Sequence, residues 1–72
     1  MFDMKIEKQL NIEDRTLLLG IPKYDSIPEK VEIEGRQYKV IGISHGVKPT
    51  FVSLEIEKTA EKVISSRVSG IV

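Results

Sequence analysis

Alternating apolar and polar positions run through much of this chain. Apolar residues occupy every second position of segments 2–7 and 52–57, with charged residues or serine between them. Because neighbouring side chains on a strand point to opposite faces, this period of two predicts strands with one buried and one solvated face. The run Thr16–Gly20 predicts another short strand, which ends at Ile21-Pro22 because proline donates no ladder hydrogen bond. The pattern therefore predicts an all-β fold.

The stretch VEIEGRQYKV predicts a hairpin with a defined register. Glu34-Gly35 suits a two-residue turn, in which Gly35 supplies the positive φ angle that such turns require. In this register Val31 pairs with Tyr38 and Ile33 with Arg36. The core face then carries Val31, Ile33, Tyr38 and Val40, and the solvated face carries Glu32, Glu34, Gln37 and Lys39.

After Val40 the alternation breaks at Ile41-Gly42-Ile43, and two outcomes are open. A β-bulge at Gly42 would let Ile41 and Gly42 oppose one residue, so that Ile43 returns to the core. Alternatively, the strand runs straight and both isoleucines face away from the core. We favour the bulge, because bulges are common where a sheet bends into a barrel.

The C-terminal segment fits two structures. Its β-branched residues and Gly70-Ile71-Val72 favour a closing strand or an irregular tail. A short helix is the alternative, with Thr59 as N-cap. The apolar residues with helical spacing are Ala60, Val63, Ile64 and Val68.

The length of 72 residues predicts one domain, and the strands predict its architecture. We expect residues 1–72 to form a single small β-barrel of five or six strands, with the short C-terminal helix as the alternative for the tail. A domain this short buries little apolar surface, so a homo-oligomer or a partner surface would add stability.

A second apolar set is predicted from the same parity. Leu17, Leu18 and Leu19 are consecutive, so they cannot all point into one core. With Leu17 and Leu19 inside, Leu18 points outward, and Phe51 lies opposite the buried positions of the strand that follows it. Leu18, Ile41 and Phe51 then form the second set. Either the tail covers these residues or they stay singly exposed, or they form a contact patch for a second copy or a larger protein.

Composition narrows the possible partners and locations. The chain has 11 basic and 11 acidic residues, which argues against a general nucleic-acid footprint. It has no cysteine, no apolar run long enough to span a membrane, and no basic-then-apolar start typical of a signal peptide. We therefore expect a cytoplasmic protein without disulfides and without a membrane partner.

No constellation of residues predicts catalysis, a cofactor or a metal site. His45 is the only histidine, and we interpret it as an exposed loop residue. Glu32, Glu34, Glu55 and Glu57 lie opposite the predicted core, where nearby lysines suggest a solvated face with ion pairs. We expect no enzyme. For RNA, the candidate contact is Tyr24 beside Lys23, since single-strand binders stack bases on exposed aromatic rings next to cations.

One resemblance to a known family rests on Arg15-Thr-Leu-Leu-Leu-Gly20. The second domain of translational GTPases, a small β-barrel beside the GTP-binding domain of elongation factors, typically has Gly-Thr-Val-Val-Thr-Gly at this place. Thr16 and Gly20 match that spacing, Ser26–Ile33 resembles the next strand, Tyr38–Ser44 resembles the third, and Arg15 replaces the family's first glycine. The likeness covers roughly residues 15–57. It implies a small closed barrel and contact with RNA or a translation partner, and no GTPase activity.

The leading hypothesis is therefore a non-catalytic protein-interaction or assembly module that works through the second apolar set, with a protein partner or a homo-oligomer. The alternative hypothesis is an RNA-associated or translation-associated barrel.

Overall fold

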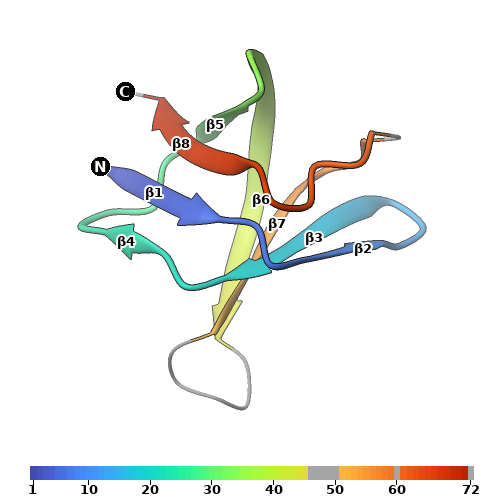
Figure 1. Ribbon diagram of the computed structural model, residues 1–72, viewed down its shortest axis with the longest axis horizontal. Coiled ribbons are helices and arrows are strands. Elements are labelled where there is room, and N and C mark those ends of the chain that lie inside the picture. The colour runs from blue at the N-terminus through green and yellow to red at the C-terminus, as the bar shows by residue number, and fades with distance from the viewer. Residues whose placement is uncertain (46–50, 60, 72) are drawn as a thin grey trace.

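The computed structural model describes residues 1–45, 51–59 and 61–71, and every regular element in them is a β-strand (Figure 1). The all-β class is thus confirmed, and the alternative of a short C-terminal helix is wrong for the described residues. The eight strands are β1 Phe2–Lys5, β2 Lys8–Asn11, β3 Arg15–Gly20, β4 Lys23–Tyr24, β5 Lys30–Ile33, β6 Arg36–His45, β7 Val52–Glu57 and β8 Arg67–Ile71. No helix in the described ranges has the length and hydropathy needed to cross a bilayer.

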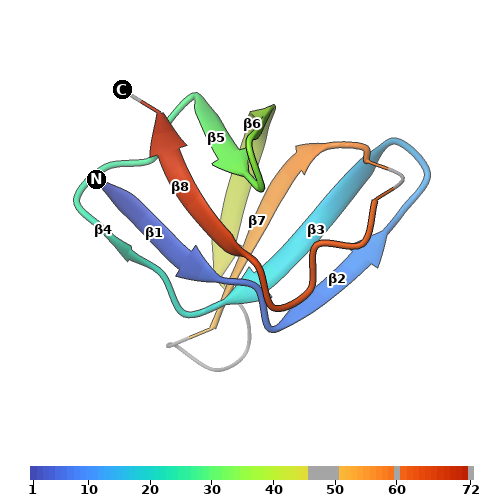
Figure 2. The ribbon, with the colours of Figure 1, turned by 45° about the horizontal axis from the view of Figure 1, so that its top comes forward.

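The strands form one antiparallel sheet in the order β2-β3-β7-β6-β5-β8-β1-β4. No ladder among the described residues joins its two ends, β2 and β4. The chain bends at Ile6-Glu7, between β1 and β2, and again at Ile21-Pro22, between β3 and β4 (Figure 2). The described residues thus contain eight strands, where the sequence indicated five or six.

The β5–β6 hairpin has the register that its turn predicts. Val31 pairs with Tyr38 and Ile33 with Arg36. Glu34 and Gly35 have φ angles of 51° and 81°, so both turn residues adopt the positive φ of a primed turn. The core face is buried or packed against the core along its whole length, and the opposite face is exposed.

The predicted bulge in β6 is also confirmed. Val40 pairs with Ile56 while Gly42 pairs with the adjacent residue Glu55, so Ile41 is inserted as an extra residue. As a result Ile43 turns back and packs against the core. Ile41 stays exposed on the outside of the sheet.

The core lies on the inner side of the bent sheet and contains the alternating apolar residues of β1, β5 and β7, as the pattern predicts. Val63 and Val68 come from the C-terminal segment and complete it. The cluster consists of Phe2, Met4, Ile6, Leu18, Val31, Ile33, Tyr38, Leu54, Ile56, Val63 and Val68.

The leucine triplet has the opposite orientation from the one expected. Leu18 is fully buried in the core, whereas Leu17 and Leu19 lie on the outer side and are partly exposed. The cause is the ladder between β3 and β7, which sets Leu18 opposite the buried Leu54. Gly20 enforces the same parity, because a Cβ atom there would lie 2.3 Å from the carbonyl oxygen of Lys5. Leu18 therefore cannot line an exposed surface of this fold.

The segment between β7 and β8 is held against β2 and β3 by side chains. The amide of Gln9 donates to the Glu61 carbonyl and accepts from the Val63 N–H, both at 2.8 Å, and thus takes the place of a peptide unit. Thr59 donates its N–H to the Thr16 hydroxyl at 3.1 Å, and its own hydroxyl accepts from the Glu61 N–H at 3.2 Å. This local turn at Thr59 replaces the helix N-cap expected as the alternative.

Candidate functional site

The outer side of the β2–β3 hairpin is unusually apolar. Leu17 pairs with Leu10 across the hairpin, so both side chains point outward together with Leu19. Ile12 and Ile21 continue the same parity beyond the ends of β2 and β3, and their side chains are 42% and 57% exposed. Phe51 precedes Val52, the partner of Gly20, and so stands at the next position beside Ile21. We call Leu10, Ile12, Leu17, Leu19, Ile21 and Phe51 the outer apolar face.

An ion-pair network borders this face at the tip of the hairpin. The Arg15 guanidinium contacts the Glu55 carboxylate at 2.6 Å and that of Asp14 at 3.1 Å. The hydrogen bond from Arg15, aided by its charge, lowers the pKa of Asp14, and the hydrogen bonds to Asp14 and Glu55 raise the pKa of Arg15. These charges separate Ile41, on β6, from the leucines of β3. The outer apolar face therefore ends at Arg15 and Glu55.

Two further carboxylates are held in their charged form elsewhere on the surface. The hydrogen bond from Arg67, which joins β8 to β1 at 2.9 Å, lowers the pKa of Asp3 and raises that of Arg67. The hydrogen bond from the N-terminal ammonium lowers the pKa of Asp25. Both carboxylates belong to ion pairs on the surface.

The structure separates the three residues expected to form the second apolar set. Leu18 belongs to the core, Phe51 lies on the outer apolar face and is partly exposed, and Ile41 is 46% exposed beyond the Arg15–Glu55 pair. A second apolar surface does exist, but sequence reasoning missed most of its members, which are Leu10, Ile12, Leu17, Leu19 and Ile21. The signal that could have found them is Gly20, because a glycine inside a strand marks a close backbone approach and hence an inward position.

The candidate RNA-contact residues, Lys23 and Tyr24, point to opposite faces of β4. Lys23 pairs with the outward Asp3, whereas Tyr24 pairs with the buried Phe2. The rings of Phe2 and Tyr24 have centroids 5.5 Å apart and are tilted by 41°. One face of the tyrosine is thus occupied within the protein, and the lysine does not stand beside its ring.

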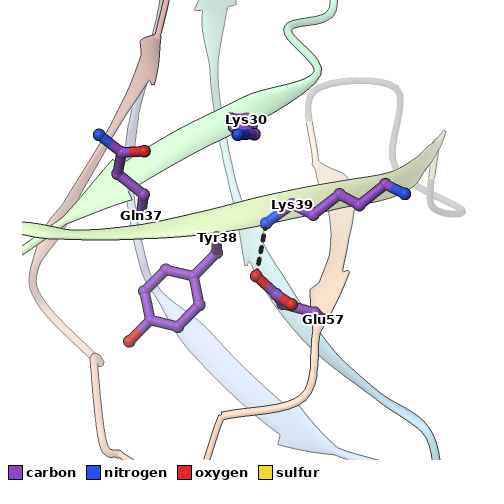
Figure 3. Close-up of a pocket in the computed structure, with 5 residues that line it drawn as sticks. All are labelled: Lys30, Gln37, Tyr38, Lys39 and Glu57. Carbon is purple, nitrogen blue, oxygen red and sulfur yellow. Dashed lines mark hydrogen bonds between the residues drawn. The ribbon is translucent and has the colours of Figure 1, made fainter.

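A polar pocket of about 220 Å³ lies on the outside of the β5–β6 hairpin (Figure 3). Lys30 and Lys39 are directly paired across the two strands, and neither belongs to an ion pair among the described residues. The Glu57 carboxylate on the pocket wall accepts a hydrogen bond from the Lys39 backbone N–H at 2.9 Å. Gln37 and Tyr38 complete the lining. Like charges directly opposite each other repel, and the two lysines with the one carboxylate give the lining one net positive charge.

The described residues contain no group of three or more histidine, aspartate or glutamate side chains arranged to hold a metal ion. His45 is exposed at the end of β6, and Glu32 and Glu34 are exposed on β5 and its turn. Comparison of the chain with family models, curated proteins and solved structures gave no match. The likeness to the second domain of translational GTPases therefore stays a prediction.

Proposed function

We propose that this protein is a non-catalytic protein-interaction module whose contact surface is the outer apolar face. The observation that carries the proposal is the concentration of six large apolar side chains on one side of the sheet. Five come from the β2–β3 hairpin and its ends, and Phe51 comes from the position before β7. Scattered apolar residues are normal on protein surfaces, but a contiguous patch usually marks a site of association. Ile12 and Ile21 stand at the two ends of this patch with about half of their side-chain surface exposed.

We also propose that β1 with β2, and β3 with β4, act as two bent strands of a six-stranded barrel. Two backbone hydrogen bonds at the first bend support this arrangement: Glu7 donates to the Leu19 carbonyl at 2.8 Å and Ile6 donates to the Ser66 carbonyl at 2.9 Å. The bend thus bonds to β3 on one side and to the approach of β8 on the other. Such a closed barrel would present the outer apolar face on a stiff support.

Photo-crosslinking inside the cells that produce the protein tests the proposed contact surface. A benzoylphenylalanine placed at Leu10 or Ile21 is expected to give protein adducts, because these positions lie within the contact. The same group at Ile27, which is 50% exposed in the loop between β4 and β5, is the matched control. That loop lies on the far side of the molecule from the hairpin tip (Figures 1 and 2). Mass spectrometry of the adducts identifies the partner. Equal adducts at all three positions, or none at Leu10 and Ile21, would contradict the proposal.

Contact with RNA is the second candidate function, and the pocket between Lys30 and Lys39 is the observation that favours it. A phosphate bound there would relieve the repulsion between the two lysines. Fluorescence anisotropy with a single-stranded RNA oligonucleotide is expected to show binding at low salt that falls steeply as the salt concentration rises. Replacing both lysines by serine should weaken the binding, while Lys62→Ser, an exposed control on another segment, should not. Lack of binding by the unchanged protein at low salt would exclude this candidate.

A further inference from the structure

We propose that the partner of the outer apolar face is the same face of a second copy of this chain, related by a two-fold axis. This inference rests on the proposed function, because it names the partner of that same surface. In this arrangement the hairpins run in opposite directions. The base of each hairpin, at Lys8, then lies over the tip of the other, at Glu13-Asp14.

The charges around the face are distributed in a way that suits this arrangement. At the tip, the four carboxylates of Glu13, Asp14, Glu55 and Glu57 are accompanied by three cations, which leaves one net negative charge. The cations are Arg15, Lys58 and Lys39, and the backbone N–H of Lys39 donates to Glu57. At the base, Lys8 points outward because it pairs with Leu19.

The other charges at the base offset each other, since Lys5 lies 4.0 Å from Glu7. The base is thus positive and the tip negative, with apolar residues between them. A surface with this pattern is complementary to itself only when one copy is turned end to end.

The free surface of the hairpin is its face and not its edge. β2 is the last strand of the sheet order, so its outer edge is where another strand could add. The side chain of Gln9 instead ties this edge to residues 61–63, and Val63 enters the core beside it. The segment before β8 runs alongside β2 in Figure 2. A second copy therefore meets the leucines and isoleucines of the face.

The size of the face predicts a reversible dimer. Four residue positions along β3, spaced two apart from Arg15 to Ile21, span roughly 20 Å, and the three strands involved span roughly 15 Å with their side chains. The product of these dimensions is roughly 300 Å² on each partner, which is smaller than the roughly 800 Å² of a standard specific interface. We therefore expect a weak dimer that dissociates in the upper micromolar range, and not an obligate dimer.

A charge-reversal cycle on the purified 72-residue chain tests this inference. Light scattering across protein concentrations should show the mass rising from 8.1 kDa to about twice that value. Lys8→Glu alone and Glu13→Lys alone should each raise the dissociation constant on the order of tenfold, because the two-fold axis places two such contacts in each dimer. The double variant should restore the unchanged protein's affinity to within about threefold. Lys30→Glu is the control and should have no effect, because Lys30 is exposed on β5, which pairs with β6 and β8 and not with the hairpin or β7.

The possible results separate this inference from the proposed function. A chain that stays monomeric at millimolar concentration overturns self-association, even where crosslinks from Leu10 lead to a different protein and support the interaction module. If the double variant dimerises even more weakly than each single variant, the end-to-end arrangement is overturned. Circular dichroism of each variant checks that the sheet is intact. A lower mass by light scattering then reflects dissociation of the dimer and not unfolding.

Discussion

Replacement of Leu18 by alanine is expected to lower the free energy of unfolding by about 2–5 kcal/mol. The side chain is fully buried and faces Leu54 in the ladder between β3 and β7. Its removal leaves a cavity that the surrounding strands cannot close without breaking their ladders. A domain of this length has a total stability of roughly 4–11 kcal/mol, so this variant should unfold at a much lower denaturant concentration or not fold at all.

The matched control for Leu18 is its neighbour, Leu17. Leu17→Ala removes the same atoms from the outer side of the strand, where they are partly exposed, and should cost less than about 1 kcal/mol. Urea unfolding of the two variants, followed by circular dichroism, measures the difference. The opposite ranking would mean that Leu17 and Leu19 are the core residues, and the outer apolar face would then lose its central members.

Gly20→Ala is expected to destabilise the protein by about 3 kcal/mol, near the upper end of the usual cost of overpacking. A Cβ atom at this position would lie 2.3 Å from the Lys5 carbonyl oxygen and 3.0 Å from the Met4 side chain. The methionine can move, but the carbonyl is part of β1, which is paired on both sides. The substitution must therefore push β3 away from the first bend.

Gly42→Ala provides the control for the general cost of adding a methyl group to a strand glycine. The nearest atom to a Cβ at Gly42 is the Glu55 Oε2, at 3.9 Å, which is an ordinary contact. We expect this variant to change the stability by no more than about 0.5 kcal/mol. Thermal unfolding of Gly20→Ala and Gly42→Ala measures the loss of stability at each glycine. A similar loss at the two glycines would show that the close approach at Gly20 is not what requires a glycine.

The parts of the fold that were predictable are those fixed by residues near each other in the sequence. The register of the β5–β6 hairpin follows from Glu34-Gly35 and the alternation on either side of it. The bulge at Gly42 was the favoured one of two arrangements, and the register shift between Val40 and Gly42 confirms it. In each case turn chemistry and local parity favour the arrangement that buries the apolar side chains.

The orientation of the leucine triplet was not predictable by the same reasoning. Parity shows that Leu17 and Leu18 face opposite ways, but it does not show which of them faces the core. That choice is made by β7, more than thirty residues along the chain, and by the contact between Gly20 and β1. The candidate site changed for the same reason. With Leu18 buried, the outer side of β3 carries two leucines, Leu17 and Leu19, and Leu17 lies beside Leu10 of β2.

The pairing of the first strand with the last sets the order in which the sheet can form. β1 lies between β4 and β8, and the bond from Arg67 to Asp3 links positions 64 apart in sequence. Contacts this distant carry a large loop-closure cost, so β1 gains its second neighbour late in folding. During synthesis on the ribosome, Phe2 and Met4 stay unburied until residues 67–71 have left the exit tunnel and can pair with β1. Exposed apolar side chains make the nascent chain prone to aggregation during this interval.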